Sequence, residues 1–177
     1  MIYHMIAFGL GFCLDLLLGD PYWLPHPIRV IGNFIGILEK RMNKKECSEK
    51  YLVRAGIGMV ALVLLTVLMV TALLLILAYR IHPAAGVILE MIMTYQILAA
   101  KCLKVESMKV YNCLKENDLI AARHAVSMIV GRDTGRLDET GVAKAAIETV
   151  AENTSDGVIA PMLYTALAGT VLGFFYK

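Results

Sequence analysis

The chain has 177 residues, of which 58% are hydrophobic and only 18% are charged, and its formal net charge is +2. Soluble domains carry about a quarter charged residues, so this balance indicates that lipid is part of the solvent. Basic residues are interspersed with acidic ones, which argues against a nucleic-acid-binding surface. The four cysteines form no C-x-x-C pair, and we expect free thiols rather than a metal centre.

The hydrophobic residues are grouped into four blocks. The block at 55–79 carries no charge and, at about 1.5 Å per residue, is long enough to cross a bilayer, where only a helix satisfies the backbone. Weaker blocks cover residues 2–18, 84–100 and 158–176. We predict an all-α, polytopic membrane protein, a single integral membrane domain with about four transmembrane helices. For each weaker block, an interfacial or re-entrant segment is the alternative.

The connecting segments predict how the chain is oriented. Residues 19–54 and 101–157 are rich in Lys and Arg, whereas the turn after the second block contains only Arg80. Because basic loops stay in the cytoplasm, we predict two cytoplasmic loops and an outside N-terminus in the inner (plasma) membrane. Asp15 and Glu90 lie inside apolar blocks, so we expect these spans to pack against protein rather than lipid.

The first loop opens with three prolines between residues 21 and 27. Proline removes backbone donors and forces the preceding residue toward extended conformations, which predicts a rigid, non-helical strap. The strap places Asp20, His26 and Arg29 beside the membrane exit. The alternative is an ordinary interfacial turn whose prolines stop the first helix. Residues 30–42 then show the apolar periodicity of an amphipathic helix that can lie on the membrane surface.

The second loop begins as a predicted continuation of the third span, over residues 101–115. Asn117 and Asp118 interrupt it and cap a helix predicted over 119–130, which Gly131 ends.

A Gly-bounded loop follows at residues 131–136, with Arg132, Asp133 and Thr134 at its centre. Its two guanidiniums suit phosphate or carboxylate, because arginine can donate two parallel hydrogen bonds. The alternative is a solvated turn with a local pair between Arg132 and Asp133.

A further helix is predicted over 138–153, followed by a turn at 154–157. Glu148 and Glu152 recur on one side of this helix, and the turn brings Asp156 within reach of them. With Asn153, these carboxylates form an oxygen-rich cluster of the kind that binds Mg²⁺ alongside substrate phosphates. The alternative is a solvated helix face stabilised by the spacing of Lys144 and Glu148.

Four strings in these loops together resemble a known family. They are residues 15–21 (DLLLGDP), 25–29 (PHPIR), 129–134 (IVGRDT) and 146–161 (AIETVAENTSDGVIAP). Their order and their separation by membrane spans resemble the N-terminal portion of the CobD/CbiB family, the adenosylcobinamide-phosphate synthases of cobalamin biosynthesis. Family members are considerably longer than this chain.

The resemblance implies a membrane ligase that joins (R)-1-amino-2-propanol, or its O-phosphate, to a carboxylate of the corrinoid adenosylcobyric acid. ATP is the co-substrate, Mg²⁺ the cofactor and adenosylcobinamide (phosphate) the product. As hypotheses, Asp20 or His26 accepts the proton of the amine, and Arg29 or Arg132 holds a phosphate. The remaining assignments place Asp133, Thr134 and Asn153 at the substrate or phosphate, and Glu148, Glu152 and Asp156 at Mg²⁺.

Two other functional classes stay open. A non-catalytic membrane scaffold would use the same polar motifs to dock a cytoplasmic partner. A transporter would use Asp15, Glu90 and Gln96, although transporter sites usually lie near the membrane midplane and the long motifs here lie outside it. Association with other cobalamin-biosynthesis enzymes, or with a second copy of the chain, is also open.

Overall fold

The computed structural model of the chain describes residues 2–21, 23–42 and 48–177. Within these ranges the secondary structure is helical and contains no β-strand, which confirms the all-α prediction. In chain order the helices are α1 (Ile2–Leu18), α2 (Pro27–Met42), α3 (Glu49–Ile81), α4 (Pro83–Ile97), α5 (Ala100–Lys115), α6 (Leu119–Ser127), α7 (Glu139–Thr154), the π-helix η1 (Ser155–Ile159) and α8 (Ala160–Tyr176).

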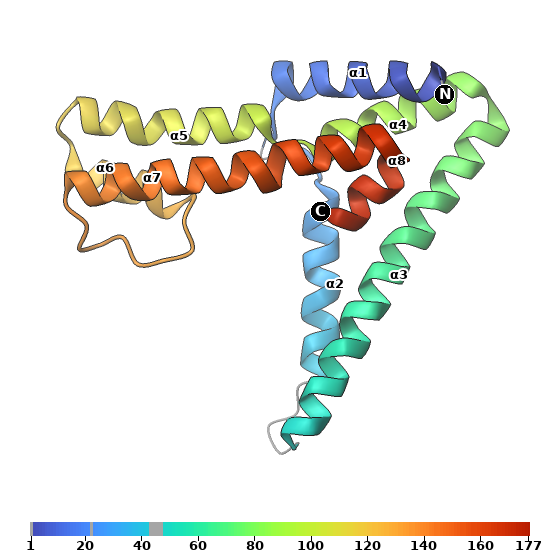
Figure 1. Cartoon of the computed structure of the whole chain (residues 1–177), viewed down its shortest axis with the longest axis horizontal. Helices are drawn as coiled ribbons and strands as arrows, with labels where there is room; N and C mark the ends of the chain where they lie inside the picture. The colour runs from blue at the N-terminus through green and yellow to red at the C-terminus, as the bar shows by residue number, and fades with distance from the viewer. Residues whose placement is uncertain (1, 22, 43–47) are drawn as a thin grey trace.

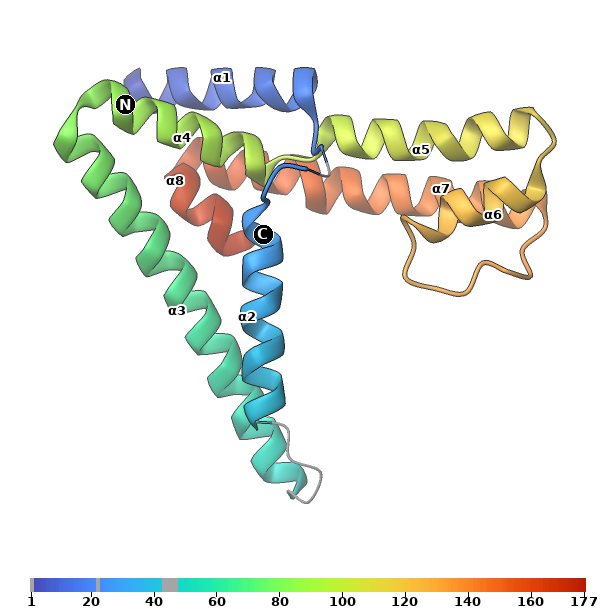
Figure 2. The ribbon, with the colours of Figure 1, turned by 180° about the vertical axis from the view of Figure 1, so that it is seen from behind.

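The helices form a membrane-type group and a projecting arm (Figures 1 and 2). Helices α1, α4 and α8 pack together, and α3 contacts α4 and α8 before it diverges from them. Helices α5, α6 and α7 contact one another and form the arm, which extends beyond the end of α1. The N-terminus and the α3–α4 turn lie at one end of the group, and the strap and the arm lie at the other.

Three helical stretches of the described chain are long and apolar enough to cross a membrane: Glu49–Ile81, Pro83–Lys115 and Glu139–Tyr176. Helix α1 is a shorter apolar helix. Large hydrophobic side chains are exposed along the whole of α3, as expected where lipid replaces water as the neighbour. These features fit the predicted polytopic membrane protein.

The predicted continuation of the third span into residues 101–115 is wrong in one respect. Helix α4 ends at Ile97, and the non-helical pair Leu98–Ala99 separates it from α5. The Leu98 side chain is fully buried at this break. Tertiary contacts therefore interrupt a sequence whose local pattern favours one helix.

The last apolar block is not one straight span. At Gly169 the backbone takes φ 83° and ψ 167°, and the two parts of α8 fold back on each other. The rings of Tyr164 and Tyr176 stack with centroids 4.7 Å apart, whereas in a straight helix residues twelve apart would be separated by about 18 Å. Only glycine adopts this φ readily, so the reversal depends on its missing side chain.

Side-chain caps fix several helix starts in the polar regions. Asp118 accepts a hydrogen bond from the backbone N–H of Ala121, and Asp138 accepts one from Gly141. These caps confirm the predicted start of α6 and place the start of α7 within one residue of its prediction. Helix α6 ends at Ser127, before the predicted end at Val130, and the predicted surface helix begins earlier, at Pro27.

The carboxylates inside the apolar helices are packed against protein, as predicted. Glu90 is 5% exposed, accepts a hydrogen bond from the Tyr79 hydroxyl at 2.6 Å and lies 2.6 Å from His4 Nδ1. The other ring nitrogen of His4 lies 3.2 Å from the carbonyl oxygen of Ala166. A buried carboxylate is costly unless its oxygens have partners. The partners of Glu90 come from other helices, so this network joins α1, α3, α4 and α8.

Close contact between α1 and α4 depends on Gly11. A Cβ atom at this position would lie 2.6 Å from Thr94 Cβ and 2.7 Å from the Met91 carbonyl oxygen. Gly9, on the same helix, has no neighbouring atom within 4 Å of the corresponding position. Replacing each glycine by alanine therefore distinguishes an effect on packing, expected at Gly11 alone, from an effect on helix propensity, expected at both positions.

We expect Gly11→Ala to lower the thermal unfolding midpoint in detergent, since overpacking costs about 1–3 kcal/mol. Gly9→Ala is the matched control and should leave the midpoint unchanged or raise it, because alanine is the better helix former. Equal midpoints for the two variants would contradict the close α1–α4 contact.

Candidate functional site

The junction between α1 and α5 positions both predicted functional segments. Ala99, at the N-cap of α5, offers no side-chain cap, and Asp15 Oδ2 of α1 instead accepts a hydrogen bond from the Ala100 backbone N–H at 3.0 Å. The Lys101 ammonium donates to the Leu17 carbonyl, and the Tyr95 hydroxyl donates to the Gly19 carbonyl. These contacts hold the start of the strap against the α4–α5 break.

The strap forms one side of a cavity of ≈ 320 Å³, which we call the strap cavity. All three predicted catalytic residues line it, so the structure brings them together. The other lining residues come from the strap, α2, α5 and the last residue of the chain. The full set is Asp20, Pro21, Leu24, His26, Ile28, Arg29, Cys102, Glu106 and Lys177.

Asp20 and His26 form the polar centre of the strap cavity. His26 Nε2 lies 3.8 Å from Asp20 Oδ1, and both side chains are mostly shielded from solvent. His26 Nδ1 accepts a hydrogen bond from the Ile28 backbone N–H at 3.2 Å. A neutral imidazole that accepts at Nδ1 carries its proton on Nε2, so His26 turns a donor toward Asp20. Asp20 is therefore the better placed of the two to accept a proton.

Burial shifts the pKa values of this pair in opposite directions. It raises the pKa of the Asp20 carboxyl above its ordinary value, against the opposing charges of His26, Lys177 and Arg29. It lowers the pKa of His26, an effect that the charge of Asp20 partly offsets. Both changes follow from the cost of burying a charged form. The result is a neutral imidazole next to an unusually basic carboxylate.

A second cavity of ≈ 380 Å³ lies on the arm, between the end of α6 and the second half of α7, and we call it the arm cavity. It contains four of the residues predicted to bind substrate, phosphate or metal. Its lining residues are Ile129, Val130, Gly131, Arg132, Glu148, Thr149, Glu152 and Asn153.

Arg132 and Glu148 face each other across the arm cavity. The guanidinium donates to Glu148 Oε2 at 2.9 Å, and Lys144 Nζ lies 3.8 Å from Glu148 Oε1. Asn153 uses its amide N–H to donate to the Thr149 carbonyl at 3.0 Å. Exposed ion pairs of this kind contribute at most about 1 kcal/mol, so an incoming anion can replace Glu148 at Arg132.

Asp133 and Thr134 lie in the predicted loop but do not line the arm cavity. Asp133 Oδ1 accepts from the Gly135 backbone N–H at 2.9 Å and closes a local turn. Thr134 is buried and donates to the Arg123 carbonyl at 3.1 Å, which holds the loop against α6. Both residues shape the loop that presents Arg132.

The predicted metal set of Glu148, Glu152 and Asp156 is not assembled. Within the described residues no group of three His, Cys, Asp or Glu side chains is placed to hold a metal ion. The predicted turn at 154–157 is wrong, because the helix continues through η1. Glu148 and Asp156 are therefore separated by about 12 Å along the helix, since each residue rises about 1.5 Å. Ligands of one Mg²⁺ lie about 2 Å from the ion.

The two predicted segments line different cavities that share no residue. They lie at the same end of the helix group but do not form one pocket. Cys102 and Glu106, which α5 presents to the strap cavity, are not among the residues predicted from the sequence. Their spacing of four residues places them on one helix face, and that periodicity was the available signal.

The sequence of the chain is similar to those of known proteins over nearly its whole length. Residues 8–177 match the family described as CobD/Cbib protein. The chain belongs to the CobD/CbiB family. Proteins named "Cobalamin biosynthesis protein CobD" from Halalkalibacterium halodurans and Clostridium perfringens are each 42% identical to it, and both alignments cover 98% of this chain. The protein of that name from Geobacter metallireducens is 45% identical over 93% of the chain.

These alignments cover 53%, 54% and 51% of the three relatives, so the chain spans about half their length. No solved structure matches the chain. The cysteines Cys13, Cys102 and Cys113 are free thiols, as their spacing predicted, while Cys47 lies outside the described residues.

The cap at the α1–α5 junction can be tested by hydrogen exchange. We expect Asp15→Ala to increase exchange about fivefold at the first backbone amides of α5, since a lost N-cap costs about 1 kcal/mol. Asp15→Asn keeps an acceptor oxygen and should lose less protection. Asp118→Ala is the control and should affect only the start of α6. Unchanged protection of α5 in Asp15→Ala would refute the cap.

The neutral state of His26 predicts that the stability of the fold depends on pH. Because the folded pKa lies below the ordinary 6.5, the stability that neutral His26 contributes is present above pH 6.5 and is lost on acidification toward the lowered pKa. We expect the thermal midpoint of the wild type to fall relative to that of His26→Gln between about pH 7.5 and 5.5. If the midpoints of the two proteins changed with pH in the same way, the neutral state of His26 would be contradicted. His124→Gln, on α6, should reproduce the wild-type curve.

Proposed function

We propose that the chain is part of a membrane enzyme of cobalamin biosynthesis. In this proposal the enzyme ligates (R)-1-amino-2-propanol, or its O-phosphate, to a carboxylate of adenosylcobyric acid at the expense of ATP. The observation that carries the proposal is the match to relatives named for cobalamin biosynthesis along nearly the whole chain. The grouping of Asp20, His26 and Arg29 in one cavity supports it.

The strap cavity would supply proton transfer. ATP would convert the carboxylate to an acyl phosphate, so that the C–O bond to phosphate breaks as the new C–N bond forms. Phosphate leaves, and a base must receive the protons that the amine loses. Asp20 fits this role because burial raises the pKa of its carboxyl. His26 would orient Asp20 through its Nε2–H, and the positive charge of Arg29 at the cavity wall would attract the phosphate or carboxylate of a substrate.

The arm cavity would bind the triphosphate of ATP. Arg132 would exchange its contact with Glu148 for phosphate oxygens, and the released Glu148 would join Glu152 as an oxygen ligand. Mg²⁺ is usually held by one or two protein carboxylates together with phosphates and water, so this smaller set fits the ion without Asp156. Bound there, Mg²⁺ would neutralise charge on the transferring phosphoryl group. Asn153 also lines the arm cavity, and its amide oxygen is a further candidate ligand.

The strap and the arm, whose residues line the two cavities, lie at the same end of the helix group. We place that end in the cytoplasm, as the distribution of Lys and Arg in the loops suggests. This placement gives both cavities access to cytoplasmic ATP and amino alcohol. It also leaves the N-terminus and the α3–α4 turn on the outside.

The proposal is tested with the full-length protein that contains residues 1–177, reconstituted in vesicles. The assay follows formation of adenosylcobinamide phosphate from adenosylcobyric acid, aminopropanol phosphate and Mg·ATP. We expect Asp20→Asn to lower kcat at least about 100-fold, the usual contribution of a general base. Glu152→Gln should raise the Mg²⁺ concentration required, whereas Glu139→Gln, on the first turn of the same helix, should not. Wild-type kinetics in Asp20→Asn would remove the base assignment.

Ligand-induced stabilisation separates the enzyme from a non-catalytic scaffold. A ligand that binds the folded state raises its apparent stability, by about 2.7 kcal/mol at a concentration 100 times its Kd. An enzyme should therefore gain thermal stability with Mg·ATP and with adenosylcobyric acid. No shift with either ligand would favour a scaffold that docks another protein.

A further inference from the structure

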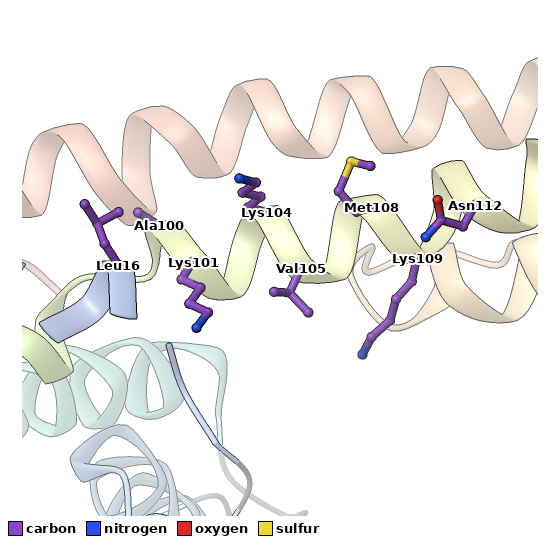
Figure 3. Close-up of a pocket in the computed structure, with 8 residues that line it drawn as sticks. All are labelled: Leu16, Ala100, Lys101, Lys104, Val105, Met108, Lys109 and Asn112. Carbon is purple, nitrogen blue, oxygen red and sulfur yellow. The ribbon is translucent and has the colours of Figure 1, made fainter. Parts of the chain in front are cut away.

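A groove of ≈ 680 Å³ lies along α5, directly beyond the end of α1 (Figure 3). We call it the lysine groove. None of its residues lines the strap cavity or the arm cavity, and none was assigned a role in the ligation. Its lining residues are Leu16, Ala100, Lys101, Lys104, Val105, Met108, Lys109 and Asn112.

Basic and apolar side chains alternate in this groove. Two rows run along α5 at four-residue spacing, one formed by residues 101, 105 and 109 and the other by 104, 108 and 112. Figure 3 shows Lys104 and Met108 on one side of the helix and Lys101, Val105 and Lys109 on the other. Side chains at this spacing share a helix surface, so each row forms a continuous stripe in which lysine and apolar groups follow one another.

The groove is electropositive. Three of its lining residues are lysines and none is acidic. The Lys101 ammonium donates to the Leu17 carbonyl but carries three N–H donors, and Lys109 pairs with Glu106, beside the groove, at 2.6 Å. Lys104 is exposed and has no hydrogen bond or ion pair within the described residues. The face therefore offers donors and net positive charge to an anion.

The groove lies where the apolar surface of the helix group ends. Leu16, Leu17 and Leu18 form the last turn of α1 and are 49%, 69% and 58% exposed. The lysines of α5 follow directly, and Val105 and Met108 continue the apolar surface between them. Exposed leucines followed by lysines are the order expected across the boundary from acyl chains to headgroups.

We propose that the lysine groove binds the phosphate headgroup of an anionic phospholipid in the leaflet beside the arm. The positive charge of Lys104 and Lys109 attracts the headgroup, while an acyl chain lies against the exposed leucines at the end of α1. Charge complementarity selects an anionic lipid, because lysines close to an anionic membrane surface are attracted to it. The bound lipid fixes the arm at a defined height above the membrane.

The test is native mass spectrometry of the chain in detergent micelles, titrated with phosphatidylglycerol or with phosphatidylcholine. We expect phosphatidylglycerol to bind more tightly. Lys104→Gln/Lys109→Gln should weaken its binding about tenfold, less than two independent lysines would give, because Glu106 already offsets part of the charge of Lys109. Lys101 is left intact because it supports the junction. Lys115→Gln/Lys144→Gln removes the same charge outside the groove and should bind as the wild type does.

Any of the following outcomes would overturn the proposal. Equal binding of the two lipids, or equal losses in the two double variants, would show that the groove has no headgroup site. Displacement of the lipid by millimolar inorganic phosphate would identify a soluble anion as the occupant. A dimer signal that the groove variant abolishes would identify a second copy of the chain. Circular dichroism checks that each double variant keeps its helices.

Discussion

The fold depends on one buried carboxylate, that of Asp15. A carboxylate in an apolar helix is costly unless its oxygens are hydrogen-bonded, and Asp15 meets part of this requirement by capping the first backbone N–H of α5. The cap fixes the break at Leu98–Ala99, so that α4 stays among the membrane-type helices while α5 leaves them as the arm. The same junction holds the strap through Tyr95 and Lys101.

The junction also determines the chemistry that the two polar segments can support. Held against α5, the strap brings Asp20 beside His26, whose Nδ1 is already used by the Ile28 backbone N–H. The neutral imidazole therefore carries its proton on Nε2 and turns a donor toward Asp20, an arrangement that depends on a hydrogen bond rather than on residue type. On the arm, Arg132 and Glu148 form an exposed ion pair in the arm cavity.

The arm carries charge on two surfaces with different chemistry. Its α7 face presents carboxylates and a guanidinium in the arm cavity, whereas its α5 face presents lysines among apolar side chains. The first arrangement pairs opposite charges in an exposed cavity. The second is suited to a headgroup, because Val105 and Met108 would gain nothing from a soluble anion. The two faces of the arm thus differ in the kind of group that each can bind.

The sequence by itself determined the helical class, the apolar blocks, the capped starts of α6 and α7, the family and the grouping of Asp20, His26 and Arg29. These follow from composition, periodicity and proline geometry, which act over a few residues. Only the tertiary structure decided the break before α5, the reversal at Gly169, the separation of the two cavities and the distance of Asp156 from Glu148. Each depends on contacts between residues far apart in the chain, such as Asp15 with Ala100 or Tyr164 with Tyr176. Local propensity carries no record of such contacts.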